Sequence, residues 1–357
     1  MVGDEYPFLR HEFLTALEES GSVSLQTGWS PRHLLVYDDA KLIALLPLYL
    51  KTHSFGEFVF DQQWAAAYRQ HGLTYFPKWL TAIPLTPCPG PRAAIEASAS
   101  QTGVMRLLFD FIRELSLEKG MSSWHCLFPG EQQAEQWQAQ GLLLREGVQF
   151  QWFNKGYRDF DDYLDAFTAA KRKMIRRERR KVDEAGIELR RVPGEQVTAA
   201  EWHTFYRFYT LTYLKNAAQP YLTPDFFTRC AATMGERMLL TLAVMHGDTV
   251  AAALSFVGRD TLYGRYWGCR QEHDALHFEA CYYQGLDYCI EQGLTRFDSG
   301  AQGEHKIARG FEPVPTYSAH WLKDAAFAAA IGNFLARERQ AIENYRQNAA
   351  EYLPFKK

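Results

Sequence analysis

The chain has 357 residues, 47% of them hydrophobic, and its 39 Lys and Arg against 42 Asp and Glu give a formal net charge of −3. This length and apolar content allow one large core or two modest ones, and the small net charge gives no reason to expect nonspecific binding to nucleic acid or membranes. The six cysteines include no Cys-x-x-Cys pair, which argues against a structural zinc site and for reduced thiols.

Targeting signals are also missing from the sequence. No apolar run approaches the roughly 20 residues of a membrane span, and the first residues lack the charged and apolar regions of a signal peptide. We therefore expect no transmembrane segment and a cytoplasmic protein.

The first half of the chain predicts a hairpin followed by further strands and a helix. Residues 33–37 and 41–50 flank the turn Asp38-Asp39-Ala40 and form the predicted hairpin. The later elements that we predict are a strand at 80–85, a rigid proline-rich loop at 87–91, a helix at 103–119 and strands at 123–128 and 148–153.

A very basic helix is predicted from about 161 to 185, where Gly186 ends it. Its cations repel one another, and Glu178 is the only acid among them. Either an anionic partner or salt bridges from a solvated helix face would relieve this repulsion. The residues that we expect to contact tRNA or another anionic ligand are Lys171, Arg172, Lys173, Arg176, Arg177 and Arg180.

The second half repeats this order of elements. It predicts a hairpin of strands 239–245 and 249–257, a third strand at 261–267, a helix at 278–293 and a strand at 294–298. The repeated order indicates an internal duplication. We therefore predict an N-terminal domain at 1–155 and a C-terminal domain at 156–357, the latter with the basic helix and a C-terminal helix.

The loop after the last of these strands, residues 297–311, places charged side chains among glycines. Glycines let backbone approach a ligand closely, and functional residues are enriched on loops. Glu304 or His305 could act as a base through a water, and Lys306 could stabilise an oxyanion or bind an anionic group. A solvent-facing Glu-His-Lys triplet is the alternative interpretation.

Two further candidate catalytic residues, His277 and Glu279, open the helix that follows the third strand. The positive end of a helix binds anions, so residues here can line a site. The alternative interpretations are that His277 is a half-buried imidazole with its hydrogen bonds satisfied, and that Glu279 only interacts with the positive start of the helix. His273 and His277 share a helical spacing, but no third ligand accompanies them, so we predict no metal.

Four segments together resemble one known family: 170–180, 263–268, 277–283 and 297–311. The C-terminal half resembles the FemAB-like, peptidoglycan-biosynthesis branch of the GNAT acyltransferase superfamily, with Lys306 and Gly310-Phe311 in the place of that group's Lys and Gly-Phe or Trp-Gly pair. The resemblance covers about residues 30 to 320. It implies an α/β fold of tandem GNAT-like (acyl-CoA N-acyltransferase) domains, each a mixed, mainly antiparallel sheet flanked by helices.

The resemblance also implies transfer of an acyl or aminoacyl group to an amine acceptor, with no permanently bound cofactor and with acyl-CoA or aminoacyl-tRNA as possible donor. An acetyl-CoA enzyme of this kind carries Arg/Gln-x-x-Gly-x-Gly/Ala between strand and helix. The chain matches it only in part, which favours an aminoacyl-tRNA-like or other carrier donor, or a half that has lost cofactor binding altogether. The candidate cofactor-binding residues are Arg265, Gly268, Arg270 and Arg309.

Three functions are consistent with these patterns. The first is a FemAB/GNAT-type acyl- or aminoacyltransferase that forms an amide. The second is a non-catalytic protein that binds an anion, RNA or an envelope precursor through the basic helix. The third is an acetyl-CoA-dependent N-acetyltransferase.

Overall fold

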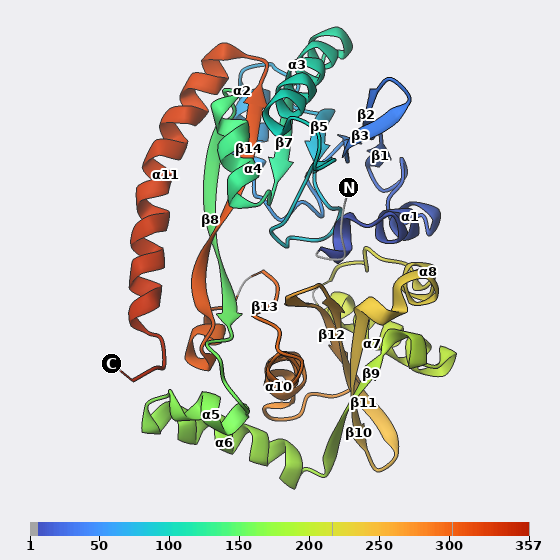
Figure 1. The fold of residues 1–357 in the computed structure, drawn as a ribbon, viewed down its shortest axis with the longest axis vertical. Helices are drawn as coiled ribbons and strands as arrows, with labels where there is room; N and C mark the ends of the chain where they lie inside the picture. The colour runs from blue at the N-terminus through green and yellow to red at the C-terminus, as the bar shows by residue number, and fades with distance from the viewer. Residues whose placement is uncertain (1–5, 216, 302, 357) are drawn as a thin grey trace. The chain divides into compact units, whose positions relative to one another are not determined.

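The computed structural model describes residues 6–215, 217–301 and 303–356, and the chain forms two compact units. Unit 1 consists of Met1–Val148 and Pro315–Arg346, and unit 2 of Gln149–Val314 and Gln347–Lys357. Gln302, within the predicted site loop, lies outside the described residues. Each unit is an α/β structure in which helices flank strands (Figure 1). Each unit also has its own buried core.

The elements assigned to unit 1 are η1 (Pro7–Leu9), α1 (His11–Glu19), β1 (Trp29–Pro31), β2 (Leu34–Asp38), β3 (Lys41–Leu46), β4 (Tyr49–Lys51), α2 (Gln62–Gln70), β5 (Lys78–Thr81), β6 (Ala94–Ile95), α3 (Gln101–Lys119), β7 (Ser123–Leu127) and α4 (Glu131–Ala139). The chain passes between the units within β8 (Leu143–Phe153), β14 (Glu312–Leu322) and α11 (Ala325–Glu351).

The elements of unit 2 are α5 (Phe160–Asp165), α6 (Ala169–Glu184), β9 (Ile187–Pro193), η2 (Gly194–Gln196), α7 (Ala199–Lys215), α8 (Pro224–Met234), η3 (Gly235–Arg237), β10 (Met238–Met245), β11 (Asp248–Val257), β12 (Thr261–Cys269), α9 (Leu276–Phe278), the π-helical turn η4 (Glu279–Tyr283), α10 (Gln284–Glu291), β13 (Arg296–Asp298) and η5 (Glu304–Arg309).

The sheet of unit 1 has the strand order β1-β4-β5-β7-β14. Its neighbours are antiparallel except β5 and β7, which run parallel and are joined through α3. The predicted first hairpin is confirmed by the pairing of β2 with β3, but its second strand, predicted at 41–50, ends at Leu46. Both strands lie in a separate sheet of order β2-β3-β6. Pro47 cannot donate a ladder hydrogen bond, so the chain breaks there before β4 begins in the main sheet.

In unit 2 the order is β9-β10-β11-β12-β13-β8, again with one parallel pair, β12 and β13, joined through a helix. The predicted hairpin of β10 and β11 and the third strand β12 are confirmed. The fold class predicted from the sequence, α/β with mixed, mainly antiparallel sheets flanked by helices, is confirmed as well.

The two sheets share one strand pattern, and their last strands are exchanged. In each sheet three antiparallel strands lead through a helix to a parallel strand, which pairs with an antiparallel one. β8 follows β7 in the sequence but pairs with β13, whereas β14 follows β13 but pairs with β7. The duplication is therefore present in the topology, but the β2–β3 hairpin is not its counterpart to β10–β11. The chain therefore crosses between the two units after residues 148, 314 and 346. The sequence predicts a single domain boundary near residue 155.

The basic helix predicted at 161–185 is two helices, α5 and α6. Phe167 is fully buried between them and forms an isolated β-bridge with Phe355, while the Thr168 N–H donates to the carbonyl oxygen of Pro354 at 2.9 Å. Burial of Phe167 and these backbone contacts outweigh continuation of the helix, and most of the cations lie on α6.

Two buried histidines connect β7 and β14 in unit 1. His125 and His320 are register partners, and their Nδ1 atoms lie 2.7 Å apart. The ring of Trp64 on α2 packs edge-on against His320, with ring centroids 4.9 Å apart. Burial lowers the pKa of His320 to about 3 and lowers that of His125 as well. Both rings are therefore uncharged at neutral pH.

Acid should destabilise the protein through these histidines. Below pH 6.5, the ordinary pKa of His, the unfolded chain binds protons that the folded state does not bind. The free energy of unfolding therefore decreases as the pH is lowered. The expected slope is up to about 1.4 kcal/mol per pH unit for each histidine. Urea unfolding at pH 7 and pH 5 should show a smaller loss for His320→Gln than for the wild type, and an unaltered loss for the exposed His71→Gln. An equal loss in His320→Gln would contradict this assignment.

Candidate functional site

The candidate site in unit 2 begins where β12 and β13 part. The two strands pair in parallel only from Thr261 opposite Arg296 to Tyr263 opposite Asp298. β12 continues to Cys269, whereas β13 ends at Asp298 and the chain turns into the loop predicted from the sequence. Where two strands part, the backbone and side chains beside the gap are available to a ligand. Here the gap lies at the end of β12, the strand that leads into α9.

Lys306 is held inside this loop. Its side chain is only 2% exposed, and its Nζ donates to the carbonyl oxygen of Gly300 at 2.6 Å. Asp298 lies at the start of the same turn, where its Oδ1 accepts from the Gly300 N–H at 2.9 Å. Burial raises the pKa of Asp298, and the charges of Arg265 and Lys306 oppose that shift. The solvent-facing alternative therefore does not describe Lys306.

Arg309 ties the loop to the basic helix. Its Nη2 donates to both carboxylate oxygens of Glu178 at 2.7 and 2.9 Å, its Nε donates to the Tyr283 hydroxyl at 3.0 Å, and its guanidinium lies 3.4 Å from the Phe278 ring centroid. Nη1 donates to the carbonyl oxygen of His305 at 2.7 Å. These contacts make Arg309 a positioning residue for η5 in this structure, with its donors engaged by protein groups.

His277 lines a cavity of about 510 Å³ at the end of β12. The ring of Trp267, also in the wall, packs against His277 with centroids 5.4 Å apart. Burial, together with the nearby charges of His305, Arg309 and Lys306, lowers the pKa of His277 to about 4. Its ring is therefore neutral at pH 7 and able to accept a proton. The cavity is lined by Thr212, Lys215, Trp267, Cys269, Glu272, His273, Leu276 and His277.

His305 is an exposed residue of the loop, and its ring lies near His277 of the cavity wall. Its ring centroid is 6.1 Å from that of His277, and its Nε2 lies 2.9 Å from the Tyr282 hydroxyl. Burial and the charges of Arg309 and Lys306 lower the pKa of His305. The fold thus brings together three of the predicted catalytic residues, His277, His305 and Lys306.

The two predicted catalytic acids have different surroundings. Glu279 is 4% exposed, and its Oε1 accepts from Arg179 at 3.2 Å and from Gln284 at 2.8 Å. Burial raises its pKa, and the Arg179 charge opposes the shift. Glu304, in contrast, is exposed at the start of η5. Glu279 is placed to connect the π-helical turn with α6.

The predicted cofactor-binding residues of β12 do not gather around one point. Gly268 pairs with Ala252 inside the sheet, and a Cβ on it would lie 2.2 Å from the backbone carbonyl of Phe208 in α7. Glycine is thus required for the close packing of α7 on β12, which are neighbours in Figure 1. Arg270 is exposed, with its Nη1 3.8 Å from Asp248 Oδ2, and Arg265 lies near enough to Asp298 to affect its pKa.

The basic helix α6 has one paired and one unpaired set of cations. Arg172, Arg176, Arg179 and Lys181 form ion pairs with Asp165, Asp161, Asp287 and Asp274, respectively. Among the described residues Lys171, Lys173, Arg177 and Arg180 form no ion pair. A surface hollow of about 270 Å³ runs along this helix, lined by Ala169, Arg172, Lys173, Arg176, Arg177 and Arg180. The salt-bridge interpretation is thus confirmed for part of the helix, and the anionic partner stays a prediction for the rest.

Sequence reasoning did not identify Glu178, Tyr283 and Asp298 as site residues. Glu178 carried a signal, because it is the single acid within the basic run, whereas Tyr283 and Asp298 depend on tertiary contacts. In the described parts of the chain no group of His, Cys, Asp and Glu residues is arranged to hold a metal ion. No helix of those parts is long and apolar enough to cross a membrane.

Comparison with solved structures identifies proteins of the same fold. FemX superposes with a TM-score of 0.55 at 12% identity, covering 92% of this chain and 94% of FemX. The C-terminal domain of a putative lysylphosphatidylglycerol synthetase from Agrobacterium fabrum gives 0.55 at 11% identity over 91% and 96% of the chains. L-PGS from Bacillus licheniformis gives 0.54 at 11% identity over 94% and 99%.

At these identities the likeness concerns the fold alone. No curated protein sequence matches the chain. The family comparison, in contrast, covers residues 1–357 and matches the FemAB-like family, described as peptidoglycan biosynthesis/recognition. The chain therefore belongs to the FemAB-like family, as the resemblance of its C-terminal half predicted.

Proposed function

We propose that unit 2 transfers an acyl or aminoacyl group to an amine and forms an amide. The observation that carries this proposal is the position of His277 in the wall of the 510 Å³ cavity, with His305 and the buried Lys306 close enough to shift its pKa. Membership of a peptidoglycan-related family supports an envelope precursor as the source of the amine.

The chemistry requires a proton acceptor, a group that stabilises the oxyanion, and two aligned substrates. The amine nitrogen attacks the donor carbonyl carbon, the new C–N bond forms, and the C–O or C–S bond to the carrier breaks. His277, neutral at pH 7, accepts the proton that the amine loses. Lys306 supplies positive charge for the carbonyl oxygen, and the carrier leaves with its electron pair and is protonated.

The donor that fits best is an aminoacyl-tRNA or a similar anionic carrier. Gly268, in the position where an acetyl-CoA enzyme carries a phosphate-binding glycine, is closed off by the backbone of Phe208. The hollow along α6 offers unpaired cations to a phosphate backbone instead. An acetyl-CoA-dependent N-acetyltransferase is the competing enzyme, and protection of the protein from thermal unfolding by CoA would favour it.

Substitution of the site residues should slow turnover without loss of donor binding. We expect Lys306→Met and His277→Gln each to lower kcat about 100-fold, because general-base and oxyanion contributions have this size. Turnover is measured as release of a labelled aminoacyl group from a charged tRNA pool in the presence of a peptidoglycan-precursor extract. Lys155→Met is the matched control, since Lys155 is an exposed lysine of unit 2 paired with Glu312. Wild-type turnover in both site variants would contradict the assignment.

Removal of unpaired cations from α6 should weaken donor binding and its salt dependence. For the triple variant Lys173→Gln/Arg177→Gln/Arg180→Gln we expect the slope of log K against log salt to fall by about 2 to 3, since each phosphate contact contributes roughly 0.7 to 0.9. Filter binding of charged tRNA at several salt concentrations measures this slope.

The control for this variant changes the same net charge elsewhere in unit 2, at Arg158, Arg207 and Arg229, and should leave the slope unaltered. Equal slopes for the two triple variants would show that α6 is not the binding surface. Normal binding dependent on α6, with no turnover by the wild type under any condition, would instead favour the non-catalytic anion- or RNA-binding function.

A further inference from the structure

Unit 1 contains a row of titratable side chains that the proposed reaction does not use. Lys51 on β4 and Lys78 on β5 are direct register partners, and both are 0% exposed. His125 and His320 continue the row on β7 and β14. Because side chains alternate along a strand, these register relations place all four on the same face of the sheet.

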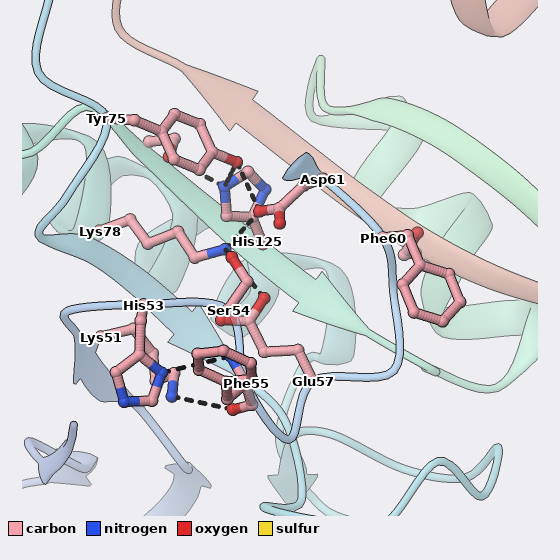
Figure 2. A network of polar contacts seen from close by, with 12 residues as sticks. Lys51, His53, Ser54, Phe55, Glu57, Phe60, Asp61, Tyr75, Lys78 and His125 are labelled. Carbon is pink, nitrogen blue, oxygen red and sulfur yellow. Dashed lines mark hydrogen bonds and ion pairs between the residues drawn. The ribbon is translucent and has the colours of Figure 1, made fainter. Parts of the chain in front are cut away.

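One loop, residues 52–61, supplies polar contacts to both lysines, and its two carboxylates contact Lys78 (Figure 2). Lys78 Nζ donates to Glu57 Oε2 at 2.8 Å, to Asp61 Oδ2 at 2.5 Å and to Ser54 Oγ at 3.2 Å. Lys51 Nζ donates to the carbonyl oxygen of Phe55 at 3.3 Å and lies 3.8 Å from the Trp29 ring centroid. The cations therefore belong to strands, and Glu57 belongs to the loop.

Stability does not account for this arrangement. Like charges directly opposite each other on neighbouring strands are destabilising, and buried ion pairs recover their desolvation cost only when every polar atom is satisfied. Glu57 Oε1 and Asp61 Oδ1 are buried and have no hydrogen-bond partner among the described residues. An incompletely satisfied buried charge cluster is more typical of a functional site than of a stabilising core.

The loop itself is strained and weakly anchored by apolar contacts. Glu57 stands between Gly56 at φ +79° and Phe58 at φ +60°. A left-handed conformation is unfavourable for a residue with a bulky side chain. The Phe55, Phe58 and Phe60 side chains are 70%, 39% and 63% exposed, and Figure 2 shows Phe60 turned away from the charged groups. Polar contacts to the lysines, rather than burial of these rings, thus keep the loop in place.

We propose that unit 1 carries a second ligand site, with Lys51 and Lys78 as its floor, for a carboxylate or phosphate group whose place Glu57 takes while loop 52–61 is closed. Opening of the loop moves residues 52–60 and removes Glu57, whereas Asp61, the last residue of the loop, stays at the N-cap of α2. Lys51, Lys78 and Asp61 then give the site a net charge of about +1. A ligand with one anionic group restores the balance.

The remaining groups of the row support this assignment. The Tyr75 hydroxyl donates to Asp61 Oδ2 at 2.7 Å and lies 3.1 Å from His125 Nε2, so Asp61 is fixed from the strand side when the loop moves. Burial lowers the pKa of Lys51 to about 7 and raises that of Glu57 to about 7. Both charges are thus unfavourable while the loop is closed, so less free energy is lost when Glu57 leaves.

Labelling of the buried amines tests the proposal directly. An amine-acetylating reagent should modify Lys51 and Lys78 only when the loop opens, and mass spectrometry of the peptides gives the rate at each lysine. We expect Glu57→Gln to accelerate labelling of Lys51 at least 10-fold, because the competing anion is gone. Inorganic phosphate or succinate should slow labelling again, and the stronger of the two identifies the group that the site prefers.

Two further variants control this experiment. Glu96→Gln removes a carboxylate of unit 1 that pairs with the exposed Lys41 and should leave Lys51 labelling unaltered. Phe58→Asn places a residue that tolerates positive φ at the strained position and should slow labelling relative to the wild type. These readouts involve no turnover, so they are independent of the proposed transfer reaction.

The proposal is overturned if Glu57→Gln and the wild type are labelled at the same rate, or if neither anion protects Glu57→Gln. If Glu57→Gln fails to fold, as judged by circular dichroism, Phe58→Asn decides: slower labelling than in the wild type supports a loop that opens, and an unaltered rate contradicts it.

Discussion

The ion pair between Arg309 and Glu178 is the contact on which the site of unit 2 depends. Arg309 is 4% exposed, and its bidentate contact with Glu178 joins η5 to α6, while Tyr283 adds the π-helical turn to the same network. A buried arginine without its carboxylate would be costly, so these three segments are stable only together. The contact joins the loop that carries Lys306 to the basic helix α6.

Much of this fold is predictable from local patterns. Hydrophobic alternation and turn residues gave β10, β11 and β12, and helical spacing gave α3, because these elements bury one face each. The break of the basic helix at Phe167 and the exchange of β8 and β14 were not predicted. Both depend on partners far away in the sequence, Phe355 for the first and β13 and β7 for the second, and no local pattern indicates such partners.

The candidate site was predictable in kind but less so in detail. Glycines around a Glu-His-Lys triplet predicted this loop as the candidate site, yet only the fold distinguishes the buried Lys306 from the exposed Glu304. The role of Gly268 could not be predicted either, because in the sequence a glycine that packs against a helix backbone cannot be distinguished from one that binds a phosphate. In unit 1 the charged groups around Lys51 and Lys78 lie on separate strands and a loop, so their convergence has no signature in the sequence.

The central claim, amide formation from a carrier-bound donor, is tested most directly by the chemical linkage of the product. The purified protein would be mixed in one turnover with a charged tRNA pool or with acetyl-CoA, each radiolabelled in the group to be transferred, and with a peptidoglycan-precursor extract. The account predicts that the label passes from charged tRNA to an amine as an alkali-stable amide. Label that stays in alkali-labile ester linkage to tRNA, with no alkali-stable amide formed from either donor, would contradict the claim.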